Sequence, residues 1–283
     1  MLNIWKKQHL ALRLNISLDT LEMVAGDIDS YCTIKSKTTK KGKIRDVAQT
    51  NSLLKFIQRS ILDNLLTSIP ISLDAHGAVP GHSSKTNAAV HAGNKCVFGI
   101  DLKSCFPKIH SSRVRKLFEE NLRCSPAVAS LITRLTTFDY HLTQGFSTSA
   151  ALLNMMCLPL DAKIKEFVVP KRLVYSRYID DITISGDFIT ENTRGRIREL
   201  IMAEGFVLNR KKEFFSRGSL PAIVTGLNVN GDKPKVPRSY KRNLWAAKHN
   251  VRRQPMLSTA SFEKSMRSIK GKEQYIRYIE NEE

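Results

Sequence analysis

Three aspartates stand where carboxylates could take part in chemistry. Asp101 ends a short apolar run, and Asp180 and Asp181 lie side by side between two runs rich in strand-forming residues. Adjacent carboxylates in an apolar hairpin repel each other unless a cation lies between them. Carboxylates at strand ends can bridge two Mg²⁺ ions, which is the arrangement used in phosphoryl transfer. The competing interpretations are a plain turn for the pair and a capping or loop role for Asp101.

The pattern of apolar residues predicts the strands that must bring these aspartates together. A strand is expected over 97–102, and strands over 173–178 and 182–185 flank the aspartate pair. A further strand is expected over 222–229. Because strands and helices follow each other in mixed order, the sequence indicates an α+β fold with a central antiparallel sheet.

The remaining chain is predicted to be mostly helical. Residues 35–45 are expected to form a Lys-rich loop or hairpin, and 74–95, rich in Gly, His, Ser and Asn, a structured loop. Helical spacing of apolar residues, with capping residues at some starts, predicts helices over 53–66, 113–123, 126–135, 144–167 and 190–204.

The chain is strongly basic. Its 283 residues include 45 Lys and Arg against 26 Asp and Glu, a net charge of +19. Between 233 and 277, thirteen Lys or Arg stand against two Glu, whereas ordinary exposed helices mix charges. We therefore expect a polyanionic partner, nucleic acid ahead of an anionic membrane. The basic residues expected to contact nucleic acid are Arg238, Lys241, Arg242, Lys248, Arg252 and Arg253.

The sequence argues against a membrane or secreted protein. No run approaches the roughly 18 apolar residues that a membrane span needs, and no apolar segment follows Lys6 and Lys7. The five cysteines lie singly, without the spacing of a zinc site or a disulfide framework. We expect a cytoplasmic protein with reduced, mostly buried thiols.

A set of motifs between about residues 41 and 245 resembles, in order, those of reverse transcriptases. A single Y-x-D-D box is a weak signal, but the ordered set is a strong one. The segments resemble the first two fingers motifs (45–58), the first catalytic-aspartate motif (98–107), the L-P-Q-G motif (142–145), the Y-x-D-D box (178–181) and the next palm motif (205–212).

Two further matches narrow the resemblance to bacterial retron reverse transcriptases. Asn87 and His91 fit the N-A-x-x-H motif, and Val224, Thr225 and Gly226 fit the V-T-G motif. In that family both regions are associated with recognition of the cognate RNA, so the resemblance implies RNA or DNA binding here. The competing interpretations are a satisfied structural histidine and an ordinary strand that ends in glycine.

The resemblance implies a right-hand polymerase with fingers, a palm whose antiparallel sheet packs on helices, and a short basic helical thumb. The expected boundaries are 1–95 for the fingers and N-terminal region, 96–110 and 140–236 for the palm, 111–139 for a return to the fingers, and 237–283 for the thumb.

The resemblance also implies roles for individual residues. Asp101, Asp180 and Asp181 would be catalytic and would hold two Mg²⁺ ions, with dNTPs as substrates. Phe106 would be the steric gate that excludes a 2′-OH, although a core aromatic residue is the alternative. The other residues expected to bind the nucleotide are Lys43, Arg45, Gln144 and Lys211. The competing interpretation of Lys211 is that it belongs to a solvated run of charges.

The function implied is RNA-directed DNA synthesis. A retron enzyme copies part of a cognate structured noncoding RNA into single-stranded DNA (msDNA), primed from an RNA 2′-OH, as part of antiphage defence. Its partners would be that RNA, the cDNA product and an effector protein. The alternatives are an abortive-infection or diversity-generating reverse transcriptase, and an RNA-binding scaffold without synthesis. Ile179 stands where retron enzymes mostly carry Ala, and we expect it to crowd the primer terminus.

Overall fold

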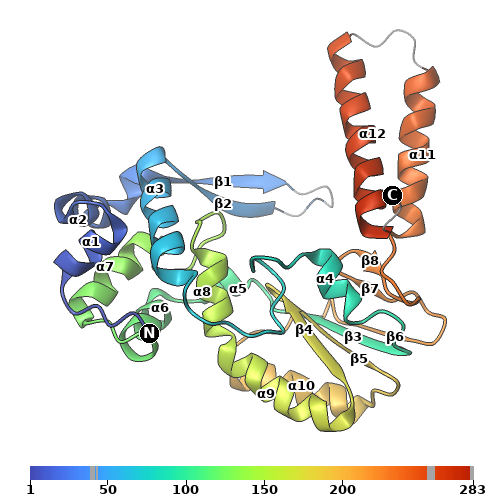
Figure 1. Ribbon diagram of the computed structural model, residues 1–283, viewed down its shortest axis with the longest axis horizontal. Coiled ribbons are helices and arrows are strands. Elements are labelled where there is room, and N and C mark those ends of the chain that lie inside the picture. Colours follow the sequence, from blue (N-terminus) through green and yellow to red (C-terminus); the bar gives the residue numbers. More distant parts are fainter. Residues whose placement is uncertain (39–41, 43, 254–258, 281–283) are drawn as a thin grey trace.

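The structure of the chain is a computed structural model that describes all residues except 39–41, 43, 254–258 and 281–283. A four-stranded antiparallel sheet, ordered β4-β5-β3-β6, lies at its centre (Figure 1). The strands are β3 (Cys96–Asp101), β4 (Val174–Tyr178), β5 (Asp181–Gly186) and β6 (Phe214–Arg217). The predicted α+β class and the central antiparallel sheet are confirmed.

Both faces of the sheet are covered, because successive side chains of a strand point to opposite faces. Phe98 of β3 packs in the main core, whereas its neighbour Val97 packs in a smaller second core. The helices α9 (Leu158–Val168) and α10 (Glu191–Ala203) run along one side of the sheet, and α4 (Ser84–Ala89) lies on the other (Figure 1). The sheet is therefore a rigid platform for residues at its ends.

A helical body with a projecting hairpin lies beside the sheet (Figure 1). The hairpin pairs β1 (Cys32–Thr38) with β2 (Ile44–Thr50) along their whole length. The buried Gln58 side chain joins two helices of the body, because its Nε2 donates to the Leu135 carbonyl at 3.1 Å. The helical segments are α1 (Lys7–Leu14), α2 (Leu18–Gly26), η1 (Ile28–Tyr31), α3 (Ser52–Ile61), η2 (Leu62–Leu66), α6 (Ser111–Lys116), η3 (Leu117–Asn121) and α7 (Pro126–Thr136).

Two long helices at the end of the chain, α11 (Arg238–Arg253) and α12 (Thr259–Glu280), stand away from the rest (Figure 1). Their base packs in the second core against α4 and the short strands β7 (Ile223–Val224) and β8 (Leu227–Asn228). The Glu280 carboxylate accepts hydrogen bonds from the Val236 N–H at 3.1 Å and from Lys241 Nζ at 2.7 Å. One acidic side chain thus ties both helices to the connection with the sheet.

Three predicted elements differ from the structure. The helix expected over 144–167 is divided into α8 (Ser149–Met156) and α9, because Pro159 lies in the first turn of α9, where proline is tolerated. The loop expected over 74–95 contains α4, which begins with a capping box formed by Ser83 and Thr86. The strand expected over 222–229 is the hairpin of β7 and β8. The short elements α5 (Cys105–Lys108), η4 (Val169–Lys171) and β6 were not predicted.

All five cysteines are free thiols and are buried, as the sequence predicts. Burial raises the pKa of the Cys32 and Cys124 thiols, and that of Cys157 to about 11. In the part of the chain that the structure describes, no helix combines the length and apolar character needed to cross a membrane.

Candidate active-site cleft

The three aspartates meet at one end of the sheet. Asp101 ends β3 and Asp181 begins β5, and the two residues are direct partners in the antiparallel register. Asp180 lies in the two-residue turn between β4 and β5. The Leu102 N–H donates to the Asp180 carbonyl at 2.9 Å, which fixes this turn against the end of β3. Segments distant in the sequence are thereby brought into one acidic group.

Burial and mutual repulsion set the protonation of this group. Desolvation raises the pKa of Asp180, and the nearby Arg45 guanidinium partly offsets the rise. Desolvation, with the charge of Asp180 added, raises the pKa of Asp181 to about 6, although the Asp181 residue is open to the solvent. A divalent cation would relieve this repulsion, and hard carboxylate oxygens are the ligands that Mg²⁺ prefers.

Asp101 is held by the segment that follows α10. The Asn209 N–H donates to the Asp101 carbonyl at 2.8 Å, and Asn209 Nδ2 lies 3.4 Å from its carboxylate. The Lys212 ammonium group pairs with the same carboxylate. Among the described residues no three metal-ligating side chains converge on one point. The donor set fits a divalent metal chemically, but its carboxylates must turn toward a common centre, and Lys212 must leave Asp101, before one binds.

A cleft of about 980 Å³ opens above Asp101 and Asp180. Its walls carry cationic and polar groups from the β1–β2 hairpin and from the segment 208–212, which suits a charged ligand such as a triphosphate. The residues from our predicted site that line it are Arg45, Asp101, Gln144, Asp180 and Lys211.

The Gln144 segment is docked on the hairpin. The Ala48 N–H donates to the Gln144 carbonyl at 2.8 Å. Gly145 follows with φ +106°, and a Cβ there would overlap with the Ala48 carbonyl oxygen, so this position requires glycine. The backbone contact joins the hairpin that carries Arg45 to the segment that carries Gln144.

Lys43 and Phe106, which were also predicted to bind the nucleotide, differ from the predicted residues that line the cleft. Lys43 lies outside the described residues. Phe106 belongs to α5 and is buried in the main core, whereas Ser104, Cys105 and Pro107 of the same segment line the cleft. The role of Phe106 as a steric gate stays a prediction.

Comparison with protein families adds to this geometry. A family model described as "Reverse transcriptase (RNA-dependent DNA polymerase)" matches residues 34–233. The chain belongs to the reverse transcriptase family. Its relatives by sequence include the retron Mx65 reverse transcriptase of Myxococcus xanthus, 34% identical over 210 residues, and the retron Ec86 reverse transcriptase of Escherichia coli, 28% identical over 241 residues. The resemblance to retron enzymes predicted from the motifs is confirmed.

The extent of these matches differs. The alignments cover 68% and 83% of this chain, but 49% of the Mx65 enzyme and 75% of the Ec86 enzyme. The chain therefore spans about half the length of the first relative. The fold resembles that of telomerase from Candida albicans in complex with a fragment of telomeric RNA, with a TM-score of 0.54 at 12% identity over 87% of this chain and 56% of that one. A right-hand α+β reverse transcriptase fold is thus supported.

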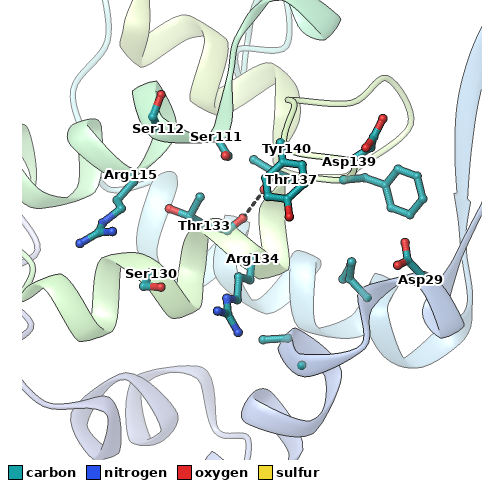
Figure 2. Close-up of a pocket in the computed structure, with 14 residues that line it drawn as sticks. Asp29, Ser111, Ser112, Arg115, Ser130, Thr133, Arg134, Thr137, Asp139 and Tyr140 are labelled. Carbon is teal, nitrogen blue, oxygen red and sulfur yellow. Dashed lines mark hydrogen bonds between the residues drawn. The ribbon is translucent and has the colours of Figure 1, made fainter.

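A second hollow, of about 700 Å³, lies beside the loop that precedes Gln144 (Figure 2). Figure 2 shows Arg115, Arg134, Asp29 and Asp139 around it, with hydroxyl side chains between them. Arg115 is already paired with Glu119 at 2.6 Å. This hollow contains none of the three aspartates, and its two cations stand against two acids.

The N-A-x-x-H residues lie inside the protein. His91 is fully buried, and its ring nitrogens are hydrogen-bonded to the Ser185 hydroxyl at 2.6 Å and the Ser176 hydroxyl at 2.7 Å. Asn87 is equally buried and accepts a hydrogen bond from Ser176 at 2.9 Å. Desolvation lowers the pKa of His91 to about 3, so the ring is neutral. Both side chains fasten α4 to the sheet, and their part in RNA binding stays a prediction.

The V-T-G residues lie next to that motif in space. Thr225 and Gly226 form the turn between β7 and β8, with φ of +46° and +83°. The Thr225 hydroxyl donates to the Ser84 carbonyl at the start of α4, at 2.9 Å. Val224 packs in the second core with Ala88 of α4. The two segments that carry these motifs, about 140 residues apart, therefore lie side by side at the base of α11 and α12.

The predicted basic residues of the last segment all fall on α11. Arg238, Arg242 and Arg253 are exposed. Lys241 and Lys248 are paired with Glu280 and Glu273, which reduces their availability to a polyanion. The side chain of Arg252 lies outside the described part of the chain. Trp245, exposed on the same helix, stacks on His249 with ring centroids 5.3 Å apart.

The sequence did not reveal a set of buried polar residues behind the turn of Ile179 and Asp180 between β4 and β5. Arg177 is fully buried and forms a salt bridge with Asp161 at 2.7 Å. Asn154 joins the pair by accepting a hydrogen bond from Arg177 at 2.8 Å. An arginine two residues from Ile179 in a strand resembles a solvent-facing residue, and only its place directly before the Y-x-D-D box could have drawn attention to it.

Proposed function

We propose that the chain is an RNA-directed DNA polymerase of the retron type. The observation that carries this proposal is the register pairing of Asp101 with Asp181, beside Asp180, at one end of a sheet under a basic cleft. Such a group of carboxylates suits phosphoryl transfer between a primer hydroxyl and a nucleoside triphosphate. Membership in the reverse transcriptase family supports the same activity.

The residues of the cleft have distinct tasks under this proposal. Asp101, Asp180 and Asp181 would hold two Mg²⁺ ions, which supply activation of the primer hydroxyl and stabilisation of the leaving pyrophosphate. Arg45 would bind the triphosphate, since a guanidinium can donate two parallel hydrogen bonds to phosphate oxygens. Gln144, whose segment is docked on the same hairpin, would hydrogen-bond near the nucleotide. Lys211, Lys43 and Phe106 would complete the proposed nucleotide site.

The parts of a right-hand polymerase follow from the same proposal. The helical body and hairpin of residues 1–95 and 111–139 act as fingers. The sheet and its helices, 96–110 and 140–236, act as the palm, and 237–283 as the thumb. The exposed arginines on α11 would follow the phosphates of a template–primer duplex, which is a salt-dependent interaction.

The finer part of the proposal concerns the template. We infer that the chain copies part of a cognate structured noncoding RNA into msDNA, beginning at an RNA 2′-OH, in an antiphage system with an effector protein. The retron names of its relatives support this inference. The joint surface of α4 and the 224–226 turn, at the base of the thumb, is where the protein would recognise that RNA.

The polymerase proposal is tested with the Asp180→Ala, Asp181→Ala double variant. We expect DNA synthesis on a supplied RNA template and primer to fall by more than about 10³-fold, because the metal ligands are lost. RNA affinity should stay close to that of the wild type, because it rests on the thumb and on α4. Retained synthesis would refute the metal-site assignment.

The retron proposal is tested on protein purified from cells that carry its native locus. The bound nucleic acid is extracted, divided, treated with RNase or DNase, and sequenced. A discrete RNA joined to a short DNA copied from it is the expected result. RNA without linked DNA, together with activity on a supplied template, would refute the retron assignment but keep the polymerase.

A further inference from the structure

The catalytic turn is held in a conformation that its sequence disfavours. Ile179, the first residue of the turn between β4 and β5, has φ +57°. A β-branched residue rarely occupies this left-handed region, which glycine or asparagine adopts readily. Strain of this kind persists only where the surroundings impose it. Asp180 and Asp181 follow directly, so the direction of their carboxylates depends on how Ile179 is held.

Arg177 imposes that conformation from inside the protein. Its Nη1 donates to the Ile179 carbonyl at 3.0 Å and to Asn154 Oδ1 at 2.8 Å. Its Nε and Nη2 donate to the two Asp161 carboxylate oxygens at 2.8 and 2.7 Å. The Tyr175 hydroxyl donates to the same carboxylate at 2.6 Å. Arg177, Asp161 and Asn154 are at most 1% exposed, so each has its position fixed by the others.

The segment 74–77 holds the turn from the other side. It runs beside β4, where the Arg177 N–H donates to the Asp74 carbonyl at 2.8 Å and the His76 N–H donates to the Arg177 carbonyl at 2.8 Å. Asn154 Nδ2 donates to the Gly77 carbonyl at 2.9 Å. A Cβ on Gly77 would lie 2.5 Å from the Ile179 nitrogen, so only glycine allows this approach. Asn154 therefore connects the two sides, through Gly77 and through Arg177.

We propose that Arg177, held by Asp161 and Asn154, is a positioning residue that keeps Ile179 in its left-handed conformation and thereby sets the direction of the Asp180 and Asp181 carboxylates. This rests on the proposed polymerase function. The network does not touch the nucleotide cleft, and its members act only through the turn. A buried ion pair alone is weak support for stability, which is consistent with a specific geometric task.

The test is a double-mutant cycle between Asn154→Ala and Ile179→Gly. Asn154→Ala removes the connection but leaves the Arg177–Asp161 ion pair intact. We expect it to lower kcat for nucleotide addition about 10- to 100-fold, with little change in the KM for dNTP, because the catalytic carboxylates are misdirected. In the Ile179→Gly background the left-handed conformation costs nothing, so Asn154→Ala should lower kcat by less than about threefold there. An equal loss in both backgrounds would refute the proposal.

Binding of Mn²⁺ alone, followed by electron paramagnetic resonance, gives a readout that needs no synthesis. We expect Asn154→Ala to weaken Mn²⁺ binding and Ile179→Gly to restore part of it. The matched control is Asn94→Ala. Asn94 is likewise an asparagine whose side chain donates a hydrogen bond, in this case to the Ser185 hydroxyl of β5 at 2.9 Å, but Ser185 lies at the end of β5 remote from the turn. The control should keep both kcat and Mn²⁺ binding; equal losses in the control and in Asn154→Ala would refute the proposal.

A second variant keeps the proposal testable if Asn154→Ala fails to fold. Gly77→Ala leaves every side chain of the network in place and pushes on Ile179 directly. It should also lower kcat and weaken Mn²⁺ binding, and unchanged values of both would refute the proposal. If the wild type itself shows no DNA synthesis, the proposed function fails, whereas the Mn²⁺ titrations still decide whether the network directs the carboxylates.

Discussion

Replacing Asp181 with Asn is expected to stabilise the metal-free protein at neutral pH while abolishing DNA synthesis. The pKa of Asp181 lies at about 6 rather than 3.8, because of burial and the Asp180 charge. A raised carboxyl pKa means that the folded chain holds the proton more tightly than the unfolded chain. The resulting stabilisation is fully present below about pH 4 and is lost as the pH rises through about 6.

The magnitude depends on solvent screening. In a fully buried site a rise from 3.8 to about 6 would correspond to about 3 kcal/mol. Because the Asp181 residue is open to solvent, we expect about 1 kcal/mol for the substitution at neutral pH. In a chain of this size that corresponds to a rise in Tm of about 2–3 °C.

The assay is thermal unfolding after treatment with a chelator, at about pH 4 and about pH 7.5. The Tm of Asp181→Asn should exceed that of the wild type at the higher pH and approach it at the lower one. Added Mg²⁺ should raise the Tm of the wild type more than that of the variant. Asp187→Asn, which removes an exposed carboxylate just after β5, is the control. A Tm difference that does not change with pH would refute the assignment of repulsion to Asp181.

Three further predictions concern residues that are not proposed as metal ligands. His91→Ala should lower the free energy of unfolding in urea by about 3 kcal/mol, because it removes a buried ring and one hydrogen bond from each of two buried hydroxyls; the exposed His82→Ala should change it by less than about 0.5 kcal/mol. Ile179→Ala should speed nucleotide addition and raise misincorporation in primer extension, and unchanged values of both would contradict crowding of the primer. Glu280→Gln should increase amide hydrogen exchange in α12, because it weakens the ion pair between α11 and α12 at their base; equal exchange in Glu280→Gln and the exposed Glu263→Gln would contradict that role.

Much of the site could be predicted because polymerase chemistry requires specific residues at specific strand ends. The aspartates carry a signal in their types and in the strands around them, and the structure brings Asp101 opposite Asp181 as the resemblance implies. Helices with strong apolar periodicity, such as 53–66, could be predicted because the face that a helix buries determines the spacing of its apolar residues. The capping box of α4 has Thr86 at the position where Glu or Gln usually signals a helix start, so the composition of 74–95 hid that helix.

The residues that orient the site could not be predicted, because their role arises from contacts distant in sequence. Arg177 is buried only because Asp161 of α9 lies opposite it, and nothing in a strand sequence distinguishes such an arginine from a solvent-facing one. The interior place of His91 likewise depends on Ser176 and Ser185, two hydroxyls that lie 85 and 94 residues further along the chain. The observed His91 side chain is buried with both ring nitrogens hydrogen-bonded, as the competing interpretation of a satisfied structural histidine describes.

The burial of all five cysteines has a practical consequence for measuring motion in this enzyme. Only the thiolate reacts with maleimide dyes, and buried thiols hidden from solvent react slowly. A pair of new cysteines on exposed sites, Lys37→Cys on the hairpin and Asn250→Cys on α11, would therefore carry donor and acceptor fluorophores without removal of any native thiol. Energy transfer between them would report whether the hairpin and α11 change their separation when an RNA duplex is added.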